Sequence, residues 1–148
     1  MIFFQKGEAM ATKIRPELSV NNRYHLEKHR YYELKHFCLQ YPLWKKELVL
    51  ISSIKTGNND ISGVHSIGSV SDPTADNAEE RLFYALRIEM LEKTARNTDC
   101  YLSDYILKGV AEGFSYEYLK AKLNIPCCRE KYYELYRKFF YLLSAERQ

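Results

Sequence analysis

Few side chains in this sequence have the type and spacing that catalysis or metal binding requires. His25 and His29 are four residues apart, so a helix would place both imidazoles on one face, as in many zinc sites. The sequence offers no third ligand for them, and a hydrogen-bonded or solvent-exposed pair is the simpler interpretation. His65 has no serine or cysteine partner. Cys127 lies near a predicted helix N-terminus, which lowers a thiol pKa, but it has no recognisable histidine partner, and packing explains it better.

The sequence also contains no glycine-rich phosphate loop, no paired-carboxylate motif and no nucleophile elbow. These motifs supply the groups that hold phosphates, transfer protons or attack a substrate. We therefore expect a protein that is not an enzyme and that uses neither a metal ion nor a cofactor.

Residues 102–143 have instead the pattern of a helix-turn-helix. Gly113 can end one helix because glycine adopts positive φ, and Ser115 can cap the next one with its hydroxyl. Asn124 occupies the turn, where it tolerates a left-handed conformation. Between about 128 and 145, aromatic residues recur every three or four positions, so charged residues face outward. A helix of this width fits the major groove of DNA.

The residues of this stretch carry two resemblances. The run GFSYEYLKAKLNI from Gly113 to Ile125 resembles the core of region 4 of bacterial sigma factors. The SDPT element at 71–74, ahead of an acidic helix and of the aromatic and basic last helix, resembles the RinA/ArpU-type phage transcriptional regulators of Gram-positive hosts. Those are small helical proteins with an N-terminal helical part, a linker containing D-P-T and a C-terminal half similar to sigma region 4.

This resemblance implies a phage- or prophage-encoded regulator that binds double-stranded DNA in the bacterial cytoplasm, with RNA polymerase as a further partner. Two departures from the sigma pattern stand out. Lys120 occupies the position of a small alanine, and the aromatic stripe resumes at Tyr132, two or three residues late. The second departure predicts a longer turn before the last helix.

Candidate DNA contacts follow by analogy with these families. Residues at the start of the last helix are the candidate base readers: Arg129, Glu130 and Lys131. Residues flanking the turn and the basic face are the candidate phosphate contacts: Ser115, Tyr116, Arg137 and Lys138.

The elements that must position these side chains are all predicted to be helical. Tyr41-Pro42 separates a first helix (about 23–40, capped by Asn21 or Asn22) from a second (42 to about 54). Further helices are expected at about 74–96, 102–112 and 115–123. We predict an all-α fold with four parts: a loose N-terminus (1–20), an N-terminal helical hairpin (21–55), a flexible linker rich in glycine and serine (56–76) and a helix-turn-helix DNA-binding domain (77–148).

Charge and cysteine usage agree with an intracellular partner of nucleic acid. The net charge of +3 is divided into +5 over residues 13–46, −4 over 47–99 and +2 over 101–148. This layout suits phosphate contacts, although solvated helix faces produce it equally well. The four cysteines lack CxxC spacing, which favours a reduced compartment, and no apolar run is long enough for a membrane span. Met10, which follows Lys6-Gly7-Glu8, is expected to be the natural start.

Two other functions remain open at this point. A small terminase subunit also combines a helix-turn-helix with oligomerising helices, but acts in DNA packaging. A helical protein–protein adaptor would use the same fold without binding DNA. In each case the N-terminal helices are predicted to form a self-association or partner surface.

Overall fold

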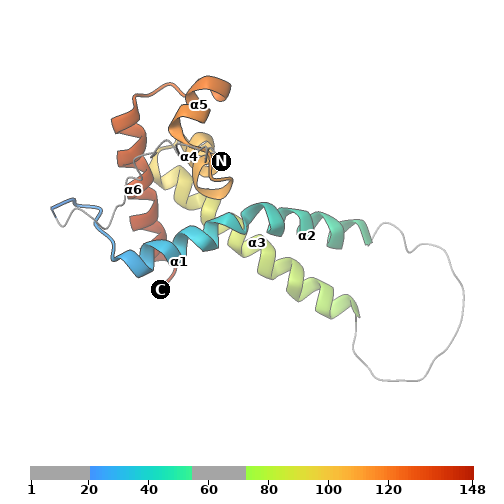
Figure 1. Cartoon of the computed structure of the whole chain (residues 1–148). Helices are drawn as coiled ribbons and strands as arrows, with labels where there is room; N and C mark the ends of the chain where they lie inside the picture. Colours follow the sequence, from blue (N-terminus) through green and yellow to red (C-terminus); the bar gives the residue numbers. More distant parts are fainter. Residues whose placement is uncertain (1–20, 55–72) are drawn as a thin grey trace, which may run out of the picture.

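The computed structural model describes residues 21–54 and 73–148, and within these ranges it contains six α-helices and no strand, which confirms the all-α prediction (Figure 1). The predicted loose N-terminus (1–20) and most of the predicted linker lie outside the described residues. The helices are α1 (Lys28–Leu39), α2 (Tyr41–Ile54), α3 (Pro73–Thr98), α4 (Ser103–Ala111), α5 (Tyr116–Leu123) and α6 (Arg129–Glu146). None of them is both long and apolar enough to cross a membrane.

The first helix begins later than predicted, at Lys28 instead of about Arg23. Asn22 does not cap it. Its side-chain oxygen accepts a hydrogen bond of 2.9 Å from the backbone N–H of Tyr24, two residues on. This local bond stabilises a turn in place of the helical conformation, as asparagine commonly does.

The predicted hairpin of residues 21–55 is not formed. Gln40 alone separates α1 from α2, and a single residue is too short a connection for two helices to fold back on each other. In Figure 1, α2 continues away from α1 and its antiparallel neighbour is α3. Pro42 does not interrupt α2, because it lies in the first turn of that helix, where no backbone N–H is needed for a helical hydrogen bond.

The predicted linker, 56–76, is too long at its C-terminal end. Helix α3 already begins at Pro73, in keeping with the preference for proline at the first helical position. The predicted boundary between an N-terminal part and a DNA-binding domain is likewise absent among the described residues, because side chains from all six helices belong to one buried cluster. Tyr31 of α1, for example, packs edge-on against Phe140 of α6 with ring centroids 5.1 Å apart.

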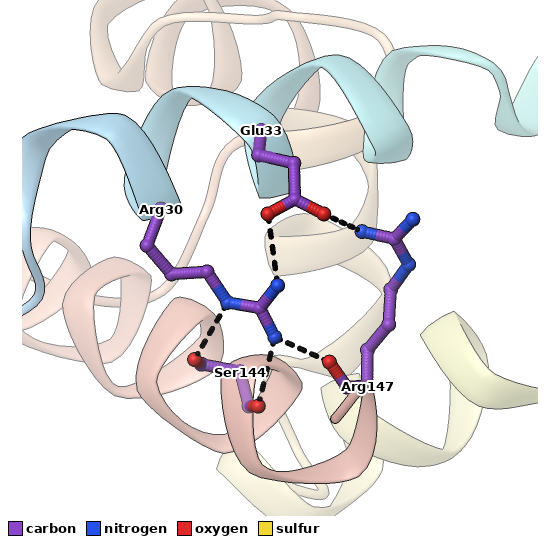
Figure 2. Close-up of polar contacts among 4 residues, drawn as sticks. All are labelled: Arg30, Glu33, Ser144 and Arg147. Atoms are coloured by element: carbon purple, nitrogen blue, oxygen red, sulfur yellow. Dashed lines mark hydrogen bonds and ion pairs between the residues drawn. The ribbon is translucent and has the colours of Figure 1, made fainter.

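The C-terminal end of α6 is held by Arg30 of α1 (Figure 2). The guanidinium donates to the Ser144 hydroxyl and to the Ser144 carbonyl, each at 3.1 Å, and also to the carbonyl of Arg147. Carbonyls in the last turn of a helix have no partner within the helix, and a cation there also complements the helix dipole. Glu33 completes the cluster, because it accepts hydrogen bonds from Arg30 at 2.8 Å and from Arg147.

These two guanidinium groups lower the pKa of the Glu33 carboxyl, chiefly through the hydrogen bond from Arg30. A carboxyl with a lowered pKa in the folded state stabilises the fold above its ordinary pKa. That contribution is lost as the pH falls through the lowered value. The hydrogen bonds that Glu33 accepts from Arg30 and Arg147 therefore stabilise the fold at neutral pH.

Arg30→Ala is expected to lower the free energy of unfolding by roughly 2 kcal/mol, since hydrogen bonds to charged groups contribute about 1.5–3 kcal/mol. Urea denaturation followed by circular dichroism measures this loss. The matched control is Arg23→Ala, which removes an exposed ion pair of 3.0 Å to Glu134, a residue that also lies on α6. That change should cost less than about 1 kcal/mol. Equal losses in the two variants would contradict the anchoring role of Arg30.

Candidate nucleic-acid interface

The helix-turn-helix begins where the sequence predicts it. Helix α4 ends at Ala111, and Gly113 has a φ of 73°, a left-handed conformation that glycine adopts without strain. Ser115 is the N-cap of α5, and its hydroxyl accepts a hydrogen bond of 3.2 Å from the backbone N–H of Tyr118. This bond satisfies one of the N–H groups that have no partner within the helix. Both predicted roles are confirmed.

The turn between α5 and α6 spans residues 124–128, which confirms the prediction of a long turn. Asn124 is left-handed, with φ 52° and ψ 49°, as predicted. Ile125 is fully buried, and its N–H donates to the carbonyl of Leu119 at 3.2 Å. The Tyr116 hydroxyl donates to the carbonyl of Cys127 at 2.8 Å and so ties the start of α5 to the end of the turn.

Close packing on α4 fixes the position of α6. Tyr132 is 1% exposed, and its hydroxyl lies directly against the backbone of Gly109: a Cβ built on Gly109 would be 1.9 Å from that oxygen. Burial raises the pKa of the Tyr132 hydroxyl, which therefore stays protonated. Because α4 has no side chain at position 109, α6 can approach it closely.

The first turn of α6 is exposed. Arg129, Glu130 and Lys131 all face solvent there, and the side chain of Cys128 at the N-cap makes no capping hydrogen bond. Arg129 forms an ion pair of 3.1 Å with Glu117 of α5. Lys131 forms a longer one, 3.7 Å, with the carboxylate one helical turn further along α6. Such exposed pairs contribute little free energy, so both cations can exchange their partners for phosphates.

The seven predicted contacts do not form a single cluster. Ser115, Tyr116 and the three residues of the first turn of α6 lie around the α5–α6 turn. Arg137 and Lys138 lie about two helical turns further along α6, roughly 10 Å from that turn. The ammonium of Lys138 donates to the carbonyl of Thr98 at 2.9 Å, at the end of α3. This geometry favours a packing role for Lys138, and its assignment as a phosphate contact stays a prediction.

Three charged residues of α5 were missed by sequence reasoning. Glu117 lies beside Arg129, and Lys120 and Lys122 are exposed in the last turn of α5. The ammonium of Lys120 donates to the carbonyl of Ile125 at 3.3 Å. The presence of two lysines just before the predicted turn could have indicated from the sequence that cations lie beside the first turn of the last helix.

No group of three or more metal-ligating side chains occurs in the part of the chain that the structure describes. The pKa of Cys127 is raised, first because the thiol is partly buried and second because Cys128 is adjacent. A raised pKa favours the unreactive thiol, in keeping with the packing role that the sequence suggests.

Comparison of the chain with protein-family models, with curated proteins and with solved structures finds no match. No family is assigned.

Proposed function

We propose that the protein is a DNA-binding transcriptional regulator whose helix α6 enters the major groove by its first turn. The observation that supports this most is that a buried stripe of side chains holds α6 in the core while its first turn stays exposed. Its later turns are held in the core by Phe139, Phe140 and Leu143, all fully buried. Its first turn presents Arg129 and Lys131 to solvent. A rigidly held helix that offers cations at its N-terminal end is the arrangement helix-turn-helix proteins use for base contacts.

Neighbouring cations complete the proposed interface. Lys122 and Lys120 stand at the end of α5, beside the turn that leads to α6. Ammonium groups bind phosphates as point charges, so Lys122 would fix the register of the protein on the duplex. Lys120 would do so after releasing the carbonyl of Ile125. Arg129 has a planar guanidinium and is the better candidate for a bidentate contact with a guanine. The carboxylate of Glu117 would have to release Arg129 for this contact to form.

A phage regulatory context is the second part of the proposal. It rests on the SDPT element and on the resemblance of residues 113–125 to sigma region 4. Double-stranded DNA and RNA polymerase are the proposed partners. A regulator of this kind would act by positioning polymerase at a promoter.

The first test is binding of the whole chain to a fluorescently labelled duplex taken from the DNA upstream of neighbouring genes. We expect the logarithm of the association constant to fall linearly with the logarithm of the salt concentration. Four phosphate contacts would give a slope of roughly −3 to −4, since each contributes about −0.9. If the protein also activates a reporter gene placed downstream of the same DNA, the result would favour a regulator. A ring-shaped oligomer would favour a small terminase subunit. Absence of binding even at low ionic strength would contradict DNA binding altogether.

A further inference from the structure

Helices α2 and α3 form an arm that extends beyond the other helices (Figure 1). Among the described helices, α2 packs chiefly against α3. Several large apolar side chains of this arm are nevertheless about half exposed: Leu43 (54%), Leu50 (55%), Phe83 (47%) and Leu86 (53%). Two helices can bury only the faces they turn toward each other, so these side chains remain in water in the single chain.

On α2 the exposed leucines lie to one side of the face that packs on α3. Trp44 and, two turns further on, Ile51 are buried, so we take their common side as the face toward α3, the helix against which α2 chiefly packs. Successive residues of a helix are rotated by about 100°, so Leu43 lies about 100° from Trp44 in the negative sense and Leu50 about 120° in the same sense. The two leucines therefore share one side of α2.

On α3, Leu91 and Ile88 are buried, and we take Leu91 as the marker of the face toward α2. Phe83 is rotated from Leu91 by about 80° and Leu86 by about 140°, both again in the negative sense. Because the two helices run antiparallel, equal senses of rotation place side chains on the same side of the pair. Leu43, Leu50, Phe83 and Leu86 thus form one surface, which we call the arm face.

An ion pair supports this placement independently. Lys45 of α2 and Glu92 of α3 are each one residue beyond the buried marker, so both are rotated by about 100° in the positive sense. They should meet on the opposite side of the arm. The structure pairs them at 3.8 Å, on the side where α4 contributes to a cavity of about 450 Å³ lined by both residues. The arm face therefore points away from α4.

Charges beside the arm face are balanced. Lys46 and Glu47 of α2 flank the leucines, and α3 carries Glu79 and Arg87 along its own apolar stripe. Two cations and two carboxylates next to an apolar centre suit a partner with the same pattern. An interface between two identical copies requires such self-complementarity, whereas nucleic acid or a strongly charged protein would leave one sign unpaired.

We propose that the arm face binds the arm face of a second copy, so that α2 and α3 of both chains form a four-helix bundle. Four helices can bury the apolar side chains that two leave exposed. This proposal gives the predicted self-association of the N-terminal helices a defined surface and adds α3 to it. It does not depend on DNA binding.

Sedimentation velocity of the whole chain at several concentrations tests the proposal. We expect a dimer that Leu50→Asp and Leu86→Asp each weaken by about tenfold or more, because each buries an unpaired carboxylate. Val49→Asp is the matched control. Val49 is 67% exposed and lies on the other flank of α2, so the dimer should persist in this variant.

Circular dichroism establishes that each variant keeps the helical content of the wild type. A wild type that stays monomeric at the highest concentration overturns the proposal. So does a dimer that Leu86→Asp leaves unchanged, or one that Val49→Asp weakens as much as Leu50→Asp. A wild-type protein that dimerises but does not bind DNA would contradict the proposed function and leave the proposed dimer standing.

Discussion

Replacing Gly109 with alanine is expected to lower the free energy of unfolding by about 1–3 kcal/mol, the usual cost of overpacking a core. Alanine is the better helix former by about 1 kcal/mol, so an exposed helix would gain from this change. Here the new Cβ would be 1.9 Å from the hydroxyl oxygen of Tyr132. The ring cannot move aside easily, because it is 1% exposed and packed against the ring of Tyr116 at 5.8 Å. Chemical denaturation measures the loss.

Tyr132→Phe should recover part of this loss. The hydroxyl of Tyr132 is buried and has no hydrogen-bond partner among the described residues, so its removal costs little. In the double variant the nearest atom to the new Cβ is the ring carbon Cζ, at 3.2 Å, a tight but tolerable contact. A double-mutant cycle should therefore give a favourable coupling free energy between the two sites. If the two changes in the free energy of unfolding simply add, contact with the Tyr132 hydroxyl is not the reason why alanine at position 109 is destabilising.

The local features of the helix-turn-helix were predictable because single residues determine them. Ser115 caps α5 through its own hydroxyl, and Gly113 and Asn124 adopt the positive φ that their side chains permit. None of these features depends on a distant part of the chain. The length of the turn was predictable as well, since Tyr132 shows where the buried stripe of α6 resumes.

The tertiary pairing of helices was not predictable in this way. An apolar stripe on α2 shows that the helix packs, but not whether its partner is α1 or α3. The prediction of a hairpin assumed that neighbours in sequence pair in space, and the single residue Gln40 between α1 and α2 prevents that. The role of Lys138 was hidden for the same reason: its charge is evident from the sequence, but the carbonyl of Thr98 that it binds is forty residues away.

If Arg129 and Lys131 read bases, Arg129→Ala and Lys131→Ala are each expected to weaken binding to a specific duplex by about 1–3 kcal/mol. Each variant should also reduce the difference in binding free energy between the specific duplex and a random one. Fluorescence anisotropy with both duplexes measures the two quantities. An equal loss on every duplex would reassign the residues to phosphate contacts. The matched control is Lys93→Ala on α3, an exposed lysine that also forms an ion pair, at 3.7 Å to Glu146, but lies far along the chain from the turn.

Glu117→Gln should act in the opposite direction and strengthen binding. The carboxylate pairs with Arg129 at 3.1 Å, so it competes with DNA for the guanidinium and repels phosphates approaching the first turn of α6. An amide of the same size removes the charge and leaves the fold intact. The gain should disappear in the Arg129→Ala background if competition for Arg129 is its source. A gain that persists there would arise from general repulsion, and weaker binding after Glu117→Gln would contradict contact between DNA and this end of α6.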